Sequence, residues 1–456
     1  MSTPSSERTR YALVGTGSRA QMYLSALAET YTDIAELVCW ADTNPGRLRW
    51  SAHHFTERSV AVPATFAVDA LAATIREHRI DTVIITTPDH THARYIVEAL
   101  DAGADVVVEK PLTVNEDGVA AIADAVARTG RSVTVTFNYR YAPRNAALKQ
   151  VIANGEIGEV TSVHFEWVLD TSHGADYFRR WHREKAHSGG LLVHKSSHHF
   201  DLVNWWTSAR PRRVFASGGL RFYGAENARA RGVGQRPERG SIDSPHRDAF
   251  SLDLRHDPQL KALYFDQEDH DGYLRDRDVF DEGITIEDNL SLVVEYDRGH
   301  SLTYALNAHS PWEGYVVAVN GTAGRAELTV VERGSVITDE NGRVVVDPSA
   351  RPDLIATDDA RPVAETLVVQ KHFETAQRRE IPSGDGGHGG GDSRLLDDIF
   401  RGVGDDPLGF VSTWRDGVDA MVVGLAGNRS LESGQVVSID ELALGTAHPL
   451  VTGAAS

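Results

Sequence analysis

The first third of the chain alternates between short apolar runs and longer segments with the length of helices. Apolar runs typical of buried parallel strands lie at 11–14, 36–40, 81–87, 105–108 and 132–136. Helices are predicted over 92–102, closed by Gly103, and over 115–128. Because strands that alternate with helices form parallel sheets, residues 10–138 are predicted to be an α/β domain with a doubly wound parallel sheet.

The pattern changes after about residue 140, where strands follow one another with few helices between them. A helix is predicted over 143–153, and the strands are predicted at 160–169, 213–217, 290–296, 301–307 and 315–320. This spacing favours an α+β domain over 139–435 with an open, mostly antiparallel sheet that has one exposed face. Residues 223–283 are polar and dense in charges, so they are predicted to be a solvated insertion with short elements of its own, or else a lid or subunit arm. The ends are predicted to be tails, a disordered one over 1–9 and a second over 436–456.

Composition limits the class of protein. Of the 456 residues, 41% are hydrophobic and 24% are charged, which is typical of a soluble globular protein. The apolar runs are too short to cross a membrane, and the first ten residues lack the apolar core of a secretory signal, so a cytoplasmic protein is expected. The net charge of −19 argues against broad nucleic-acid binding. One cysteine, Cys39, excludes a disulfide within the chain and a thiolate metal cage.

A glycine-rich turn follows the first apolar run. The sequence Gly15-Thr-Gly-Ser-Arg-Ala20 fits the pattern G-x-G-x-x-A, in which the glycines permit a tight turn and the close approach of a pyrophosphate. Asp42 ends the second strand about twenty residues later, where a carboxylate accepts hydrogen bonds from an adenosine ribose. This carboxylate would repel a 2′-phosphate, so NAD is expected and NADP is less favoured. Arg47 could soften that preference, and Arg19 is placed to meet the pyrophosphate.

Further motifs resemble those of the Gfo/Idh/MocA oxidoreductases, a family named for glucose–fructose oxidoreductase and inositol dehydrogenase. The glycine-rich turn, Thr87-Pro88 with His92, Glu109-Lys110-Pro111 and Gly155-Glu-Ile-Gly158 occur in the family's order over roughly residues 8–330. The resemblance implies an N-terminal Rossmann domain, a C-terminal α/β domain on an open sheet, a nicotinamide cofactor and usually a sugar or cyclitol substrate. It also implies that Lys110 lies between nicotinamide and substrate and that the peptide before Pro111 is often cis. The predicted cofactor-binding residues are Gly15, Thr16, Gly17, Ser18, Arg19, Ala20, Asp42, Arg47, Thr87, Pro88, His92, Glu109, Lys110 and Asn138.

A histidine-rich segment over 188–201 resembles the family's second motif, D-x-x-x-H-x-x-D, with one departure. His198 and Asp201 keep the last two positions, whereas His194 replaces the first aspartate. Oxidation of an alcohol needs a base for the hydroxyl proton, and the ordinary histidine pKa of about 6.5 suits that exchange. His198 is therefore predicted to be the base, Lys110 its electrostatic partner or co-base, and His194 the group that orients the pair or relays the proton.

The remaining candidate residues concern the substrate and a metal. The basic, aromatic stretch over 177–185 favours an anionic or polyhydroxylated ligand that stacks on Trp181, unless its arginines pair with the protein's own carboxylates. His388, framed by glycines, belongs either to a ligand contact or to a flexible linker. The spacing of His194 and His198 would suit zinc, but no acidic base lies between them and the family mostly works without metal, so no metal is predicted. The predicted substrate-binding residues are Arg180, Trp181, His182, Lys195, His199 and His388.

Together these features predict an NAD-dependent oxidoreductase that transfers a hydride between a nicotinamide cofactor and a hydroxyl of a sugar, sugar acid or cyclitol. Two alternatives stay open. One is an NAD-dependent glycosidase or lyase that acts by transient oxidation and elimination, and the other is a non-catalytic sugar-sensing scaffold of the same fold. The expected partners are a small carbohydrate-type substrate and further copies of the chain through the open sheet face, with no nucleic acid and no membrane.

Overall fold

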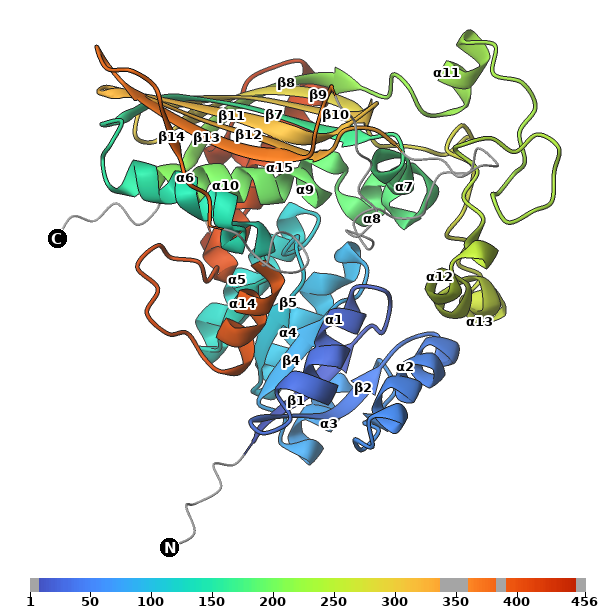
Figure 1. The fold of residues 1–456 in the computed structure, drawn as a ribbon. Helices are drawn as coiled ribbons and strands as arrows, with labels where there is room; N and C mark the ends of the chain where they lie inside the picture. Colours follow the sequence, from blue (N-terminus) through green and yellow to red (C-terminus); the bar gives the residue numbers. More distant parts are fainter. Residues whose placement is uncertain (1–7, 337–359, 383–390, 448–456) are drawn as a thin grey trace, which may run out of the picture.

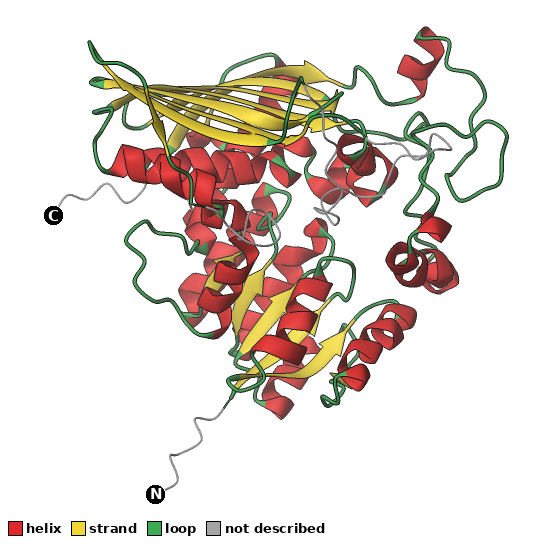
Figure 2. Cartoon of the chain, in the orientation of Figure 1, coloured by secondary structure: helices red, strands yellow, loops and turns green. Residues whose placement is uncertain are grey.

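The computed structural model describes residues 8–336, 360–382 and 391–447. A parallel sheet flanked by helices forms one end of the molecule, and a larger sheet forms the other (Figures 1 and 2). The first sheet has six parallel strands in the order β3-β2-β1-β4-β5-β6, which confirms the doubly wound Rossmann domain. Its strands are β1 (Thr9–Val14), β2 (Ala35–Ala41), β3 (Ala64–Thr65), β4 (Thr82–Ile85), β5 (Asp105–Val108) and β6 (Val133–Val135). The order reverses between β1 and β4, and ligands bind sheets of this kind at the carboxyl ends beside that point.

The helices of this domain begin and end where local signals predict. Asn44 caps α2 by accepting a hydrogen bond from the Gly46 amide, and Pro45 occupies the first turn. Gly103 ends α4 with a left-handed backbone, at φ +98°, that few other residues adopt. The helices are α1 (Ala20–Ser25), α2 (Pro45–Glu57), α3 (Leu71–His78), α4 (His92–Ala102) and α5 (Glu116–Thr129).

The second sheet has nine strands in the order β14-β13-β12-β11-β7-β10-β9-β8-β15. The pair β7–β10 is parallel and the other pairs are antiparallel, which confirms the predicted open, mostly antiparallel sheet. Residues alternate along β9 between buried and exposed, so one face is covered and the other is open to solvent. The strands are β7 (Val160–Asp170), β8 (Pro211–Gly219), β9 (Asn289–Tyr296), β10 (Ser301–Ser310), β11 (Glu313–Gly321), β12 (Gly324–Arg333), β13 (Ala364–Lys371), β14 (Gln377–Arg379) and β15 (Val437–Ser438).

Two outcomes in this sheet go beyond the sequence analysis. Strands β12, β13 and β14 have no counterpart among the predicted strands. Strand β15 pairs with β8, and Ile439 and Leu442 are buried, so this part of the predicted C-terminal tail belongs to the fold. The open face exposes Phe215 and Val293, and the predicted assembly of copies through this face stays a prediction.

Helices cover the inner face of the large sheet and separate it from the first domain (Figure 1). They include α6 (Pro143–Ala153), α7 (His173–Arg179), α8 (Lys185–Ser188), α9 (Leu191–His194), α10 (Ser196–Thr207) and α15 (Trp414–Ser433), whereas α14 (Gly391–Phe400) packs on the first domain through Phe400. None of the helices in the described residues is long and apolar enough to cross a membrane.

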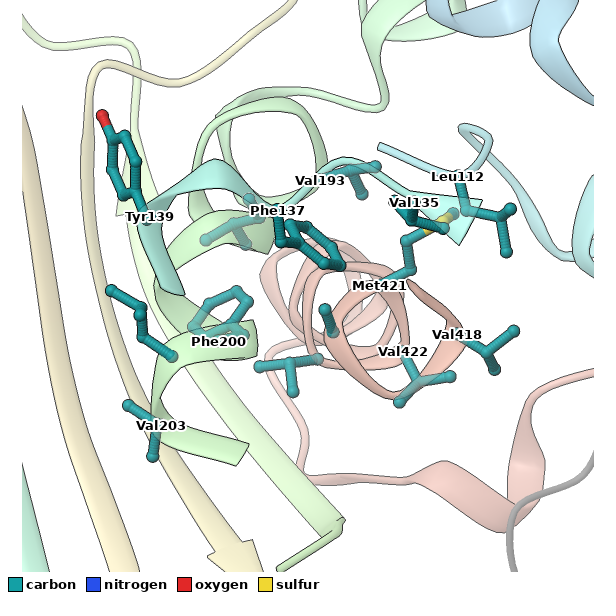
Figure 3. Packing of buried hydrophobic residues seen from close by; sticks show 14 of the residues in the cluster. Leu112, Val135, Phe137, Tyr139, Val193, Phe200, Val203, Val418, Met421 and Val422 are labelled. Atoms are coloured by element: carbon teal, nitrogen blue, oxygen red, sulfur yellow. The ribbon is translucent and has the colours of Figure 1, made fainter. Parts of the chain in front are cut away.

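Helix α15 packs against both domains and builds a shared core (Figure 3). Glycines permit the close approach: a Cβ at Gly417 would lie 3.0 Å from a methyl group of Val135, and one at Gly424 would lie 2.5 Å from the carbonyl oxygen of Leu192. The residues that Figure 3 labels in this core are Leu112, Val135, Phe137, Tyr139, Val193, Phe200, Val203, Val418, Met421 and Val422. The two domains are therefore held together by continuous apolar packing.

A buried ion pair reinforces this contact. Arg140, just after β6, donates to both carboxylate oxygens of Asp201 on α10, at 2.8 and 2.5 Å, and to Asp416 on α15 at 2.9 Å. Arg140 and Asp201 are both almost fully buried. Burial raises the pKa of Asp201 to about 6 even though Arg140 opposes the rise. The last aspartate of the predicted motif therefore anchors the segment that leads out of the first domain to α10 of the second.

The insertion over 223–283 contains the short helices α11 (Ala225–Ala230), α12 (Pro258–Leu263) and α13 (Glu268–Asp271). Elements of its own were expected there. The pair α12 and α13 extends from the second domain back to α2 of the first (Figure 1). The insertion thus bridges the two domains on the side of the glycine-rich turn.

We expect Arg140→Met to lower the free energy of unfolding by about 3–5 kcal/mol, because it leaves the Asp201 carboxylate buried without its partner. Urea denaturation measures this change. Arg213→Met is the matched control, since Arg213 pairs with Glu295 on the exposed face and its loss should cost less than about 1 kcal/mol. Equal small losses in the two variants would show that the buried pair does not stabilise the domain contact.

Candidate active site

The glycine-rich turn joins β1 to α1 at the carboxyl edge of the first sheet. Gly15 has φ +90°, and a Cβ there would lie 2.9 Å from the Thr87 side chain, so the turn requires glycine. Asp42, directly after β2, accepts hydrogen bonds from the amide of Thr16 at 2.7 Å and from its hydroxyl at 3.0 Å. Ala20 is fully buried at the start of α1. The turn therefore lies at the carboxyl ends of the strands, where sheets of this kind bind dinucleotides.

Glu109 and Lys110 follow β5 at the same edge of the sheet. Glu109 is buried and accepts hydrogen bonds from Arg19 at 2.6 Å and from the Tyr23 hydroxyl at 2.8 Å. Arg19, which the sequence analysis assigned to a pyrophosphate, is thus paired with Glu109 in this structure. The Lys110–Pro111 peptide is cis, as the family resemblance implies.

His92 links the loops that follow β4 and β5. Its ring nitrogens lie 2.9 Å from the carbonyl oxygen of Thr87 and 2.8 Å from that of Pro111. The ring is fully buried, and burial lowers its pKa. His92 therefore positions the two loops, and its predicted contact with a cofactor stays a prediction. Asn138 donates to Asp392 of α14 at 2.8 Å.

Three polar side chains meet between the domains at the centre of this edge. His194, from the second domain, lies with Nδ1 2.5 Å from a carboxylate oxygen of Asp89, just beyond β4. Its Nε2 lies 3.4 Å from the amine of Lys110, which also donates to the His194 carbonyl oxygen at 3.3 Å. With Nδ1 donating to the carboxylate, Nε2 carries a lone pair toward the amine. The structure thus forms a chain Asp89–His194–Lys110.

Asp89 was missed by the sequence analysis. It follows Thr87-Pro88 directly at the end of β4, and its position at a strand end was the available signal. The side chain is buried, with 3% of its residue surface exposed. A carboxylate of the first domain therefore supports a histidine of the second.

Removal from water shifts the pKa of all three groups. Desolvation lowers the pKa of Lys110 to about 8, although the Asp89 carboxylate opposes this shift. Burial and then the Lys110 charge lower the pKa of His194 well below its ordinary value. Burial raises the pKa of Asp89, against the pull of Lys110. The Lys110 amine therefore exchanges its proton close to neutral pH, and the His194 imidazole favours its uncharged form.

The other histidines of the segment lie differently. His194 ends α9 and His198 belongs to α10, where its ring stacks on Tyr139 with centroids 4.2 Å apart. His199 is fully buried and stacks on Trp167 at 4.2 Å, as a core residue does. Lys195 donates to the Tyr139 hydroxyl at 3.0 Å. The roles of His198 as base and of Lys195 and His199 as substrate ligands stay predictions.

Aromatic rings border the other side of His194. Trp181 is partly exposed and stacks on His182 with centroids 3.6 Å apart, and His182 meets the His194 ring edge-on at 4.2 Å. Arg180 pairs with Asp176 at 3.0 Å, which agrees with the alternative that these arginines serve the protein's own carboxylates. Trp181 and His182 thus lie beside the central chain of polar groups.

Two further predictions concern ligands. His388 lies outside the described residues. Within the described part of the chain, no three histidine, cysteine or acidic side chains are grouped so that they could hold a metal ion. That the protein works without a metal stays a prediction.

The insertion covers the glycine-rich turn. The Tyr264 hydroxyl, between α12 and α13, accepts a hydrogen bond from the Ser18 amide at 3.0 Å and lies 3.1 Å from the Ser18 hydroxyl. A Cβ at Gly17 would approach the same hydroxyl to 3.3 Å. The guanidinium of Arg47 lies 5.3 Å from the centre of the Tyr264 ring. The second domain therefore contributes directly to this edge of the first.

Comparison with known proteins agrees with this architecture. Residues 9–137 match the Gfo/Idh/MocA oxidoreductase family's NAD-binding Rossmann fold, and residues 149–439 match its C-terminal alpha/beta domain. YteT of Bacillus subtilis (strain 168), named as an oxidoreductase, is 37% identical over 405 residues, which cover 86% of this chain and 88% of YteT.

Two dehydrogenases are more distant. Inositol 2-dehydrogenase of Rubrobacter xylanophilus is 29% identical over 219 residues, 47% of this chain and 56% of that protein. The crystal structure of scyllo-inositol dehydrogenase from Lactobacillus casei with bound NAD(H) and scyllo-inositol has a TM-score of 0.58 at 16% identity. That match covers 95% of this chain and 100% of the other, and it shows a shared fold.

We expect the His194 imidazole to remain neutral through the range in which an ordinary histidine, with a pKa of about 6.5, becomes charged, because desolvation and Lys110 disfavour its charged form. Long-range ¹H–¹⁵N spectra of histidine-labelled protein should include a neutral, Nδ1-protonated ring from His194 in that range. His194→Gln assigns the signal by removing it. A His194 signal that titrates at the ordinary value would contradict this description of the site.

Proposed function

The chain belongs to the Gfo/Idh/MocA family of oxidoreductases, and from this membership we propose that it transfers a hydride between NAD and a hydroxyl group of a sugar, sugar acid or cyclitol. The observation that carries the proposal is the meeting of the Lys110 amine with the His194 imidazole beside the glycine-rich turn. Relatives named inositol 2-dehydrogenase and levoglucosan dehydrogenase support the class of substrate.

The residues at the sheet edge fit a nicotinamide dinucleotide. Gly15 and Gly17 place no side chain where a pyrophosphate would approach, a position that the Tyr264 hydroxyl borders in this structure, and Asp42 follows β2 beside them. Because a carboxylate at this position disfavours a 2′-phosphate, NAD is proposed in preference to NADP. When bound, NAD supplies the acceptor for the hydride that leaves the alcohol carbon.

The proton of the reacting hydroxyl needs a separate acceptor, and we assign that task to Lys110. With a pKa of about 8, a substantial share of its amine is neutral in mildly alkaline solution and can accept a proton. His194 Nε2, 3.4 Å from that amine, orients it by accepting a hydrogen bond, while Asp89 holds the ring from the opposite side. In the reverse direction the Lys110 ammonium donates the proton to the forming hydroxyl.

This arrangement gives the departure in the second motif a physical meaning. The family motif that this segment resembles has an aspartate at the position of His194, and here a carboxylate is supplied one side chain further away, by Asp89. The imidazole extends the polar chain across the domain boundary. Trp181, partly exposed beside His182, offers an aromatic face on which a sugar ring could stack.

We expect the protein to reduce NAD in the presence of at least one member of a panel of inositols, aldoses and uronates, followed by absorbance of the reduced cofactor. Lys110→Met should lower kcat by at least about 10²-fold, because the proton acceptor is lost. Lys371→Met, on the exposed surface of β13, should leave kcat unchanged. Release of an aryl aglycone with no net reduction of NAD would contradict the proposal and support the glycosidase alternative.

We expect the rate of alcohol oxidation to rise with pH through a midpoint near 8, because only the neutral Lys110 amine accepts the proton. Asp89 raises the pKa of Lys110, so Asp89→Asn should move the midpoint to lower pH and should lower kcat more than it changes KM. Asp81→Asn, just before the opposite end of β4, is the control and should leave the profile in place. If Asp89→Asn leaves the midpoint of the pH profile unchanged, Asp89 does not position His194.

A further inference from the structure

The segment Pro258–Asp271, which comprises α12, α13 and the turn between them, docks on the first domain beside Asp42. The side chain of Asn44, which caps α2, donates to the Gln267 carbonyl oxygen and to the Asp271 carboxylate, both at 3.0 Å. A Cβ at Gly46 would collide with the Gln267 side chain, at 1.5 Å, so the start of α2 is shaped to receive this segment. The segment Pro258–Asp271 and the start of α2 are therefore complementary in shape where β2 ends.

Arg47 lies at the centre of this contact, and all three of its nitrogens are engaged. Nε donates to the Leu263 carbonyl oxygen at 3.1 Å, and Nη2 lies 2.8 Å from the Asp271 carboxylate. Nη1 lies 3.5 Å from Asp42. The Arg47 side chain is 11% exposed and that of Asp271 is 17% exposed, so water screens the pair only in part.

The charges at this corner bear on which dinucleotide fits. Asp42 occupies the position that meets the adenosine ribose, and a free cation beside it could bind a 2′-phosphate and offset the aspartate. Asp271 prevents Arg47 from binding a 2′-phosphate, because it engages the Arg47 guanidinium and adds a second carboxylate beside Asp42. One arginine between two aspartates leaves a net charge of about −1, which repels a phosphate.

We propose that Asp271 selects the cofactor: by holding Arg47 and adding a negative charge, it excludes dinucleotides that carry a 2′-phosphate. The inference rests on the proposed use of a nicotinamide dinucleotide and extends it, because the selecting residue belongs to the insertion of the second domain. Asp42 alone leaves Arg47 available, and the docked segment takes it away.

The experiment measures dissociation constants for NADH and NADPH by nicotinamide fluorescence, without substrate. In Asp271→Asn, the ratio of the NADPH dissociation constant to the NADH dissociation constant should fall by about tenfold, the order of change expected when one partly screened charge near the phosphate is removed. Asp269→Asn is the matched control, because it removes an exposed charge two residues away in α13 and should leave the ratio unchanged.

Two further variants separate the role of Arg47 from that of the docked segment. Arg47→Ala in the Asp271→Asn background should restore the preference for NADH, because the cation that Asp271→Asn released is then removed. Tyr264→Phe removes the hydroxyl that binds the Ser18 amide, and it should change both affinities by the same factor because both cofactors carry the pyrophosphate. Circular dichroism and thermal unfolding confirm that each variant is folded.

The outcomes distinguish this inference from the function on which it rests. If the unmodified protein binds NADH and Asp271→Asn leaves the ratio unchanged, Asp271 does not select the cofactor, while the proposed function stands. If the unmodified protein binds neither NADH nor NADPH, the proposed function itself fails.

Discussion

The shared core around α15 is the constraint on which the site depends, because it fixes the distance between two domains that each supply part of the chemistry. Lys110 and Asp89 belong to the first domain and His194 to the second, so their contacts exist only at one relative placement. Apolar packing against Gly417 and the buried Arg140–Asp201 pair hold that placement. The polar centre, which is costly to desolvate, is thus stabilised by packing outside it.

The parallel domain could be predicted well because its signals are local. Apolar runs, the cap at Asn44 and the glycine after α4 each report on a few neighbouring residues. Strand β12 carried a local signal that the sequence analysis missed: Ala326, Leu328 and Val330 alternate with polar residues, the pattern of a strand with one buried face. The pattern does not encode the neighbours of β12, since its place between β11 and β13 depends on pairing over a long separation in sequence.

The site divides in the same way. Lys110 and His194 were found through short motifs, and Asp89 could have been found because a carboxylate directly after a parallel strand lies at the ligand edge. The contacts of Arg47 could not have been predicted from the sequence. Arg47 and Leu263 lie 216 positions apart, and no local pattern encodes the docking of one on the other. The polar, charge-dense composition of the insertion is compatible with a lid, but it does not encode the surface on which a lid would dock.

The pairing of Asp89 with His194 has a consequence for the history of the family. His194 is held in its orientation by the hydrogen bond from Nδ1 to the Asp89 carboxylate. A buried carboxyl group at position 89 is in turn costly unless a hydrogen-bond donor such as His194 contacts it. Neither change is favourable alone, so the two positions are expected to vary together among relatives. Chains with an aspartate in place of His194 would then carry a neutral residue in place of Asp89, and the joint state of the two positions would mark a branch of the family.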